Sequence, residues 1–292
     1  NLHTVAGINI STDDVLVAHN FLEGFNESAI VTNNSAYNRH HIIGNSIYGF
    51  DATNLPSGIG CPINYVSYGV GNRIDDNTIV YSTADTAAIR IGGCGDETTM
   101  SVRRNMIRNV AGKGILVKPS VDDKLTIWVE DNMFDDVSIA VKTETKTPLF
   151  MSWKRNSHLS VTTTLFAGVA ATDWDIGGNT GILLQTTDDT KTTILDIPIV
   201  AGKGGMVESR LLGNQSNNSN QAAYGIASTF KQVGGTTTVN ASENVFTALE
   251  TDAAWGGLIH AAGGSANILI RAEGKAATTI NWDLVECVLK TR

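Results

Sequence analysis

Apolar and polar residues alternate over short stretches in the first 185 residues, and asparagine interrupts this alternation at regular intervals. Seven segments share a central Asn, at positions 20, 45, 77, 105, 132, 156 and 179, which lie 23 to 32 residues apart. The residue three positions before each Asn is apolar: Val17, Ile42, Ile74, Val102, Val129, Trp153 and Ile176. Because one such unit cannot bury a core alone, the repeat predicts coils that stack on one another.

The spacing within each unit predicts a bend at the asparagine. Positions three and five before the Asn share the period of two that points side chains to one face of a strand. The apolar position two residues after the Asn breaks that period, so the chain must turn between them. Asn tolerates left-handed backbone angles best among non-glycine residues, so we expect it to adopt them at this corner. Another strand precedes each unit, giving about three short strands per coil.

This Asn ladder at a sharp bend resembles the right-handed parallel β-helix of pectate lyases and phage tailspikes, over about residues 1–185. The two residues before the Asn alternate in charge from coil to coil: Asp75-Asp76, Arg103-Arg104, Glu130-Asp131 and Lys154-Arg155. Stacking would place opposite charges side by side. We therefore interpret these carboxylates as salt-bridge partners that set register, rather than as paired catalytic acids.

From about residue 186 the Asn repeat stops, and separate strands with polar turns predict an antiparallel β-sandwich or jelly roll over 186–292. Within it, a strand around Tyr224, the Asp-Ala-Ala-Trp step that ends at Trp255 and a last strand carrying Trp282 resemble a C-terminal module of phage tail fibres and spikes. The resemblance implies a homotrimer with this module at its distal tip. The predicted fold is thus all-β: a right-handed parallel β-helix, then a sandwich.

Composition narrows the possible functions. The 292 residues carry 21 basic and 29 acidic side chains, a net charge of -8, which argues against a nucleic-acid partner. No apolar run approaches the about 18 residues of a bilayer helix, so we expect no membrane insertion. Cys61, Cys94 and Cys287 form no zinc spacing and are expected to be free thiols, and we expect no metal or cofactor. The chain opens at Asn1 without a signal sequence, which we interpret as the C-terminal coils of a longer helix.

Candidate binding residues lie on the outward positions of the predicted coils. Inward Ile89, Ile91, Ile115, Val117, Ile139 and Val141 would place Arg90, Lys118 and Lys142 outward in successive coils, as a basic stripe for the carboxylates of an acidic polysaccharide. A solvated face or a trimer contact is the alternative. Trp128 should also face outward, either to stack on a sugar or to be buried between subunits.

Candidate catalytic residues are less constrained. Hydrolysis of a glycan needs two carboxylates in one groove, and Asp85, Asp96 and Glu97 flank the strand that contains Ile89. A lyase would instead use a cationic base, for which Arg90 and Lys118 are candidates. Surface loops commonly carry acidic residues, so these assignments compete with a purely structural role.

The sequence therefore predicts a fragment of a phage tailspike or tail fibre that recognises bacterial surface polysaccharide, either capsule or O-antigen. Such a protein would be part of the virion and extracellular on release. The first alternative is a polysaccharide depolymerase, a hydrolase or a lyase, that acts in a groove of the β-helix. The second is a secreted cellular β-helix lyase or epimerase, against which the C-terminal module argues.

Overall fold

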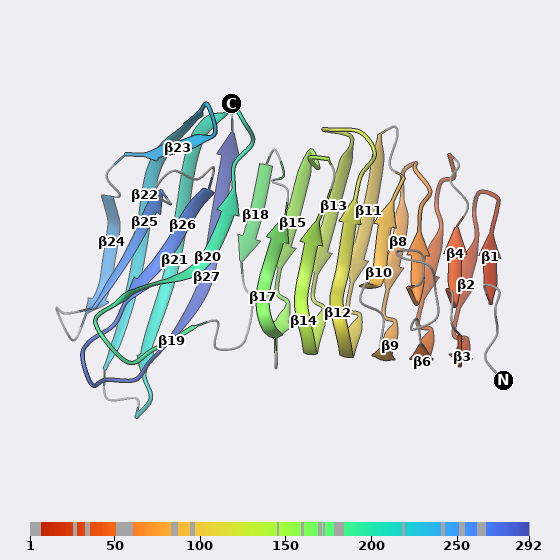
Figure 1. Ribbon diagram of the computed structural model, residues 1–292, viewed down its shortest axis with the longest axis horizontal. Helices are drawn as coiled ribbons and strands as arrows, with labels where there is room; N and C mark the ends of the chain where they lie inside the picture. Colours follow the sequence, from red (N-terminus) through yellow and green to blue (C-terminus); the bar gives the residue numbers. More distant parts are fainter. Residues whose placement is uncertain are drawn as a thin grey trace. The chain divides into compact units, whose positions relative to one another are not determined.

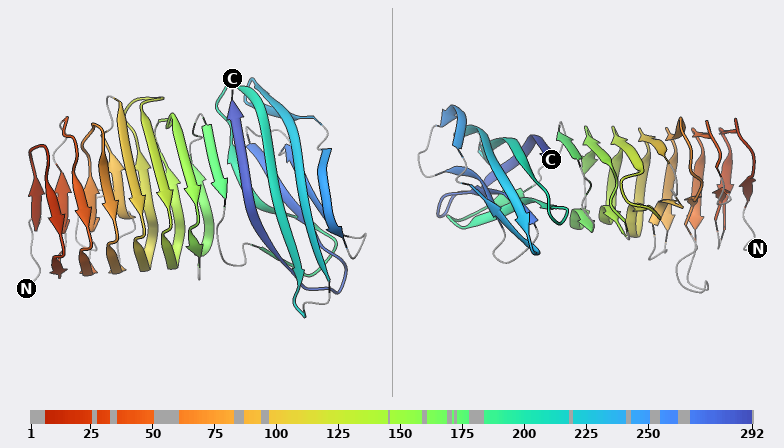
Figure 2. Two further views of the ribbon diagram at one scale, coloured as in Figure 1. Left: turned by 180° about the vertical axis from the view of Figure 1, so that it is seen from behind. Right: turned by 90° about the horizontal axis from the view of Figure 1, so that it is seen from above.

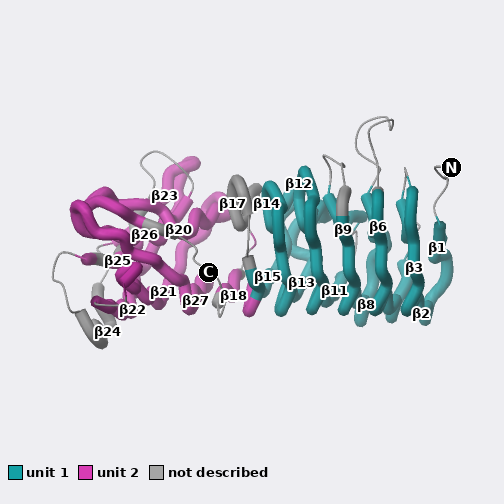
Figure 3. Tube along the Cα trace, turned by 90° about the horizontal axis from the view of Figure 1, so that it is seen from below, with its two compact units in different colours: residues 1–152, 156–169 teal, residues 153–155, 170–292 magenta. Residues whose placement is uncertain are grey.

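The described part of the protein consists of β-strands and loops in a computed structural model (Figure 1). The structure describes residues 7–25, 28–32, 36–50, 61–82, 87–93, 97–144, 146–158, 161–168, 171, 173–177, 184–217, 220–240, 243–250, 255–261 and 267–291. The chain divides into two compact units, Asn1–Ser152 with Asn156–Val169 and Trp153–Arg155 with Ala170–Arg292 (Figure 3). The predicted all-β class is confirmed, since none of the described residues is helical.

The first unit is a parallel β-solenoid of the right-handed type, and its coils follow one another along the unit (Figure 2). Its leading face holds the strands before each Asn: β2 (Leu16–Ala18), β5 (His41–Ile43), β8 (Asn72–Asp75), β11 (Thr98–Arg103) and β13 (Leu125–Glu130). Strand β15 (Phe150–Lys154) contributes residues to both units.

The trailing face follows the corner. It holds β3 (Phe21–Glu23), β6 (Ser46–Phe50), β9 (Thr78–Ser82), the first parts of β12 (Met106–Lys118) and β14 (Met133–Thr143), and β16 (Ser157–His158). The third face holds β1 (Ile8–Ile10), β4 (Ile30–Thr32), β7 (Ile63–Tyr65), β10 (Ala87–Gly92), the second parts of β12 and β14, and β17 (Val161–Gly168). Register shifts between Val110 and Lys113, and between Val137 and Ile139, separate the two parts of β12 and β14.

The core of the solenoid is a set of aligned apolar side chains, one column from each face. On the leading face, Ile42, Ile74, Val102 and Val129 pair in register and are completely buried. On the third face, the completely buried residues Ile30, Ile63, Ile89, Ile115 and Val141 pair in the same way. The inward position predicted three residues before each Asn is therefore confirmed for these coils.

The asparagines form the predicted ladder. Each Oδ1 accepts hydrogen bonds from the backbone N and the Nδ2 of the Asn one coil earlier, as Asn105 Oδ1 does from Asn77, both at 3.0 Å. The same contact links Asn20 to Asn45 and continues through Asn132 to Asn156. Each buried amide also donates to a carbonyl of the coil before, as Asn132 Nδ2 does to Val102 O at 2.9 Å.

One expectation for the corner is wrong. The left-handed backbone angle falls on the residue before each Asn: His19, Gly44, Asp76, Arg104, Asp131 and Arg155, with φ between 51° and 66°. The Asn itself is selected for its amide, which satisfies backbone groups of two coils at the bend.

The second unit contains two antiparallel sheets. The larger sheet runs β18 (Asp173–Gly177), β27 (Ile280–Thr291), β21 (Gly204–Gln215), β22 (Gln221–Val233) and β23 (Thr236–Val239), with β19 (Leu184–Thr186) on β27 and β24 (Glu243–Glu250) on β22. The smaller sheet runs β20 (Lys191–Pro198), β26 (Asn267–Glu273) and β25 (Gly256–Ala261).

Aromatic side chains of the larger sheet pack against Trp255, which directly precedes β25. Trp282 of β27 is completely buried, and its ring centroid lies 5.9 Å from that of Trp255 and 6.2 Å from that of Tyr224. A Cβ on Gly257 of β25 would lie 2.9 Å from the side chain of Leu211, so a glycine permits this close approach. The three aromatic residues that carry the resemblance to tail modules thus share one core.

The seventh predicted coil differs from the other six. Strand β18 buries Ile176, so its predicted inward position is confirmed, but one edge of the strand pairs antiparallel with β27, where Ile176 lies opposite Cys287. Asn179 lies outside the described residues. The predicted boundary between residues 185 and 186 falls inside β19, within the second unit.

Candidate functional site

Two outward rows of side chains cross the leading face, because alternate residues of each strand point away from the core. The first row runs through Leu16, His41, Arg73, Ser101 and Trp128. The second row runs through Ala18, Ile43, Asp75, Arg103 and Glu130. The part from β8 to β13 combines cations, carboxylates, a hydroxyl and an indole, and we call it the polar face.

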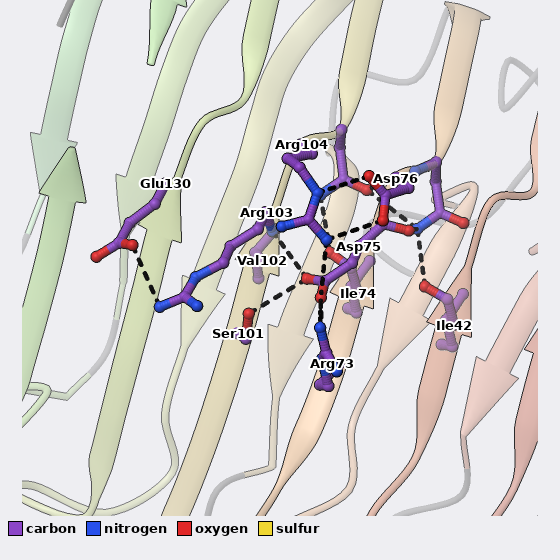
Figure 4. A network of polar contacts seen from close by, with 12 residues as sticks. Ile42, Arg73, Ile74, Asp75, Asp76, Ser101, Val102, Arg103, Arg104 and Glu130 are labelled. Carbon is purple, nitrogen blue, oxygen red and sulfur yellow. Dashed lines mark hydrogen bonds and ion pairs between the residues drawn. The ribbon is translucent and has the colours of Figure 1, made fainter. Parts of the chain in front are cut away.

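Asp75 is the centre of the polar face. Its side chain is completely buried, although it points outward, because neighbouring side chains cover it (Figure 4). Arg73 donates to Oδ2 through Nη2 at 2.7 Å and Nε at 3.0 Å. Ser101 Oγ and the backbone N of Arg103 donate to Oδ1 at 3.2 and 3.1 Å. A carboxylate with this many donors is held as a structural anion.

Glu130 occupies the same row two coils further along, next to Arg103. Arg103 Nη2 lies 3.2 Å from Glu130 Oε2, and Ser152 Oγ donates to Oε1 at 2.6 Å. The Nε of Arg103 is buried and has no hydrogen-bond partner among the described residues. The guanidinium is therefore anchored at one end and only partly satisfied by the chain.

A bidentate ion pair holds the corner beside this network. Arg104 Nε and Nη2 donate to Asp76 Oδ1 and Oδ2 at 2.7 and 2.9 Å, and Arg104 Nη2 lies 3.8 Å from Asp75 Oδ2 (Figure 4). The hydrogen bonds from Arg104 lower the pKa of Asp76 below its usual value. The predicted charge ladder is thus confirmed for Arg104 with Asp76 and Arg103 with Glu130. Neither Asp75 nor Glu130 is arranged as a free catalytic acid.

Trp128 stands at the end of the first row with its ring directed outward, between the buried Ile127 and Val129. Its side chain is half-buried, and its ring centroid lies 6.3 Å from that of Phe150 at an interplanar angle of 55°. Ser101 separates it from Arg73 in the row. An indole beside hydrogen-bonding groups is a surface on which a sugar ring can stack.

The three cations of the predicted basic stripe lie on the third face, away from Trp128. Arg90 and Lys142 stand in one row, but Leu116 is between them, and Lys118 aligns with Gly92 instead. The prediction that Lys118 continues the row of Arg90 and Lys142 is therefore wrong by two residues. The predicted inward position of Ile139 is also wrong. It pairs with Lys113 and is half-buried, because the register shift moves Ala140 into the core.

Glu144 partly neutralises this basic surface. Its carboxylate lies 2.6 Å from Lys142 Nζ and 3.9 Å from Lys118 Nζ. The hydrogen bond from Lys142, followed by the charges of Lys142 and Lys118, lowers the pKa of Glu144. Three cations with one carboxylate leave these four side chains with a net charge of +2. Arg90 Nη1 donates only a long hydrogen bond, 3.4 Å, to Asn64 Oδ1.

The predicted catalytic acids are not brought together among the described residues. Asp85 and Asp96 lie outside the part of the chain that the structure describes. Glu97 is exposed and directly precedes β11. The proposed base Lys118 of a lyase is instead engaged with Glu144.

The described residues contain no group of three His, Cys, Asp or Glu side chains placed as they would be around a metal ion. In the same residues, no helix has the length and apolar character needed to cross a bilayer. Burial raises the pKa of the Cys61 and Cys287 thiols to about 12, and neither cysteine forms a disulfide among the described residues. Cys94 lies outside the described residues.

Sequence comparison gives no relative, since no family model and no curated protein matches the chain. Three solved structures that align with it are tailspike proteins of phages of Acinetobacter. That of phage vB_ApiP_P1 is 10% identical over 97% of this chain and 76% of its own, with a TM-score of 0.26. That of phage AM24 is 10% identical over 96% and 68%, with a TM-score of 0.20.

The third structure, from the Acinetobacter baumannii bacteriophage Fri1, is described as a capsular polysaccharide depolymerase. It is 8% identical over 99% of this chain and 70% of its own, with a TM-score of 0.23. At these identities and TM-scores, the alignments lend no weight to an activity of this chain.

Proposed function

We propose that this chain is part of a phage tailspike or tail fibre that recognises an acidic bacterial surface polysaccharide, either capsule or O-antigen. The observation that carries the proposal is the basic surface of the third face, where Lys118 and Lys142 share one carboxylate, Glu144, and Arg90 has no carboxylate partner among the described residues. A net positive surface on a chain of net charge -8 is a specific feature, because the bulk charge would repel a polyanion.

The geometry of the third face suits an extended, repeating polymer. Arg90 and Lys142 are two coils apart, about 9.6 Å at the usual strand spacing, with Leu116 between them. Leu116 is only 7% exposed, and Gly92 brings no side chain to the row of Lys118. The neighbours of the cations in these rows are therefore buried or lack a side chain. The carboxylates of a glycan lying across the coils can reach the cations.

The accompanying proposals come from the sequence resemblance. The solenoid would be the shaft, the second unit would form a β-sandwich tip that holds a homotrimer and contacts the receptor, and the protein would reside in the virion. The mass in solution tests the trimer directly. A mass of one chain would remove the trimer and favour the secreted cellular lyase or epimerase instead.

The binding proposal is tested on an array of purified capsule and O-antigen oligosaccharides, both neutral and uronate-containing. The intact chain should bind uronate-containing glycans, with an affinity that falls as salt rises. Replacing Arg90 and Lys142 together with Ala should weaken this binding by about tenfold or more, since two charged contacts are lost.

The matched control is Arg108→Ala, which removes one exposed cation of the trailing face that pairs with Asp135 at 2.7 Å. It should leave glycan binding within about twofold, because it lies on a different face from the basic surface. Binding that is insensitive to the Arg90 and Lys142 changes would refute the basic surface as the site.

The competing proposal is a depolymerase that uses Asp85, Asp96 and Glu97 as acids or Arg90 and Lys118 as a lyase base. The same incubations separate it from binding alone. New reducing ends would indicate hydrolysis, and absorbance from an unsaturated uronate would indicate a lyase. Neither product is expected if the chain only binds.

A further inference from the structure

Trp128 differs from the other tryptophans of the chain in its exposure. The chain has 5 Trp residues. Four of them are at most 5% exposed: Trp153, Trp174, Trp255 and Trp282. Trp128 is half-buried on an outward position of β13, where a small or polar residue would suffice for the fold. An indole left partly in water is an unfavourable choice for stability alone, which points to a ligand.

The residues around Trp128 leave room for a ring-shaped ligand. Ser101 is the small member of the row between Arg73 and Trp128, which are two coils and therefore about 9.6 Å apart. Ser101 donates its proton to Asp75, so the lone pairs of its oxygen can accept a hydrogen bond from a hydroxyl group. Arg103 adjoins this position in the second row and is 35% exposed.

The balanced charges of the polar face favour a neutral ligand over an anionic one. Arg73, Arg103 and Arg104 are matched by Asp75, Glu130 and Asp76, so three cations and three anions cancel. An incoming carboxylate would meet Asp75 and Glu130, which already hold the guanidinium groups. A neutral hydroxyl can instead accept from the guanidinium N–H groups that remain, since each guanidinium has five.

We propose that Trp128, Ser101 and Arg103 form a subsite for a neutral pyranose unit of the bacterial glycan. The C–H face of the sugar stacks on the Trp128 indole, Arg103 donates to a sugar oxygen, and Ser101 accepts from a sugar hydroxyl. This inference rests on the proposed function, but it assigns the neutral part of the glycan to a different face from its carboxylates. The tilted ring of Phe150 supports one side of the indole.

The test uses the intact chain, the oligosaccharide array described above, and the intrinsic tryptophan fluorescence. Because Trp128 alone among the tryptophans is partly exposed, quenching by acrylamide reports on it. A bound oligosaccharide with neutral pyranose units should protect this fluorescence. Trp128→Ala should weaken binding of that oligosaccharide by about tenfold or more, and Trp128→Phe by less, since an aromatic face remains.

The matched control is Phe21→Ala, which removes a 68% exposed aromatic ring from the trailing face. It should leave binding within about twofold. Unchanged circular dichroism would show that the Trp128 variants fold. Unchanged binding by Trp128→Ala would overturn the subsite, as would binding of uronate oligosaccharides alone with no protection of Trp128.

These outcomes are distinguishable from failure of the proposed function. If Trp128→Ala binds normally while the Arg90 and Lys142 variant does not, the subsite fails and the recognition of acidic glycan stands. If no glycan binds the intact chain, both fail. If Trp128 is shielded from acrylamide without glycan, and dilution to single chains removes the shielding, then Trp128 is a subunit contact and the subsite is refuted.

Discussion

The Asn ladder predicts that Asn105→Ala severely destabilises the solenoid. The Asn105 side chain makes four hydrogen bonds in the middle of the stack. Its Oδ1 accepts from the backbone N and the Nδ2 of Asn77, and its Nδ2 donates to Ile74 O at 2.8 Å and Asn132 Oδ1 at 3.0 Å. Alanine removes all four and cannot admit water easily, because the residue is 1% exposed.

The size of the loss in folding stability depends on which buried groups lose their last hydrogen-bond partner. Asn77 Nδ2 keeps its bonds to Ile42 O and Asp75 O, and Asn132 Oδ1 keeps the backbone N of Asn105. The backbone N of Asn77 loses the acceptor that Asn105 Oδ1 provides, and each buried group left unsatisfied costs about 1–3 kcal/mol. With the weakened partners and the small void, we expect a loss of about 2–5 kcal/mol.

The control is Asn20→Ala, at the N-terminal end of the described ladder. Asn20 is exposed more than the inner asparagines, and its Nδ2 donates to Asn45 Oδ1 at 2.9 Å and to Ala18 O at 3.1 Å. Its loss leaves Asn45 Oδ1 with the backbone N of Asn20, so we expect about 1 kcal/mol. Urea unfolding followed by far-UV circular dichroism measures both variants. Equal losses would refute the argument that the buried ladder holds the coils together.

Three further predictions follow from burial and charge. Val102→Asp should abolish folding, since it places an unpaired charge at a completely buried position, and a soluble protein with native circular dichroism would contradict the coil assignment. Arg104→Gln should cost at most about 1 kcal/mol at neutral pH, because the pair with Asp76 is about half exposed. The pKa of Asp76 is lowered in the folded protein. The difference in unfolding free energy between Arg104→Gln and the unchanged protein should therefore be full above the pH at which an unfolded Asp ionises, and it should disappear as the pH falls through the folded pKa. Urea unfolding across acidic pH will test this. Cys61 and Cys287, whose pKa is about 12, should resist iodoacetamide in the native protein and react after unfolding, as peptide mass spectrometry will show.

The coils could be predicted from the sequence because their determinants repeat. The apolar column that contains Ile42, Ile74 and Val102 and the corner asparagines each recur once per coil, so chance resemblance is averaged out. The corner backbone could not be predicted in the same way. The left-handed residue is Asp76 in one coil and Arg104 in the next, and an arginine gives no local signal for that conformation.

The alternation of apolar and polar residues does not determine in which row of a face a side chain lies, as the candidate site shows. A period of two assigns a residue to a face, but a shift by two residues leaves the face unchanged. For this reason the sequence placed Lys118 outward correctly and yet put it in the row that Leu116 occupies. The register shift before Ile139 has a related effect. Strand β12 has one residue more than β14 between the paired positions on either side of the shift, and this changes the parity of the pairing without a mark in the sequence.

The outward side chains of the polar face are of two kinds, according to how many hydrogen-bond partners the chain gives them. The Asp75 carboxylate accepts hydrogen bonds from Arg73, Ser101 and Arg103, so its negative charge holds adjacent coils in register. Trp128 has no comparable set of polar partners, and it stays half-buried beside that network. A network that fixes the strands beneath an exposed ring holds the ring in a constant orientation, which lowers the entropy lost when a ligand stacks on it. The structural acids and Trp128 are thus parts of one arrangement, and this arrangement supports the proposed subsite for a neutral sugar.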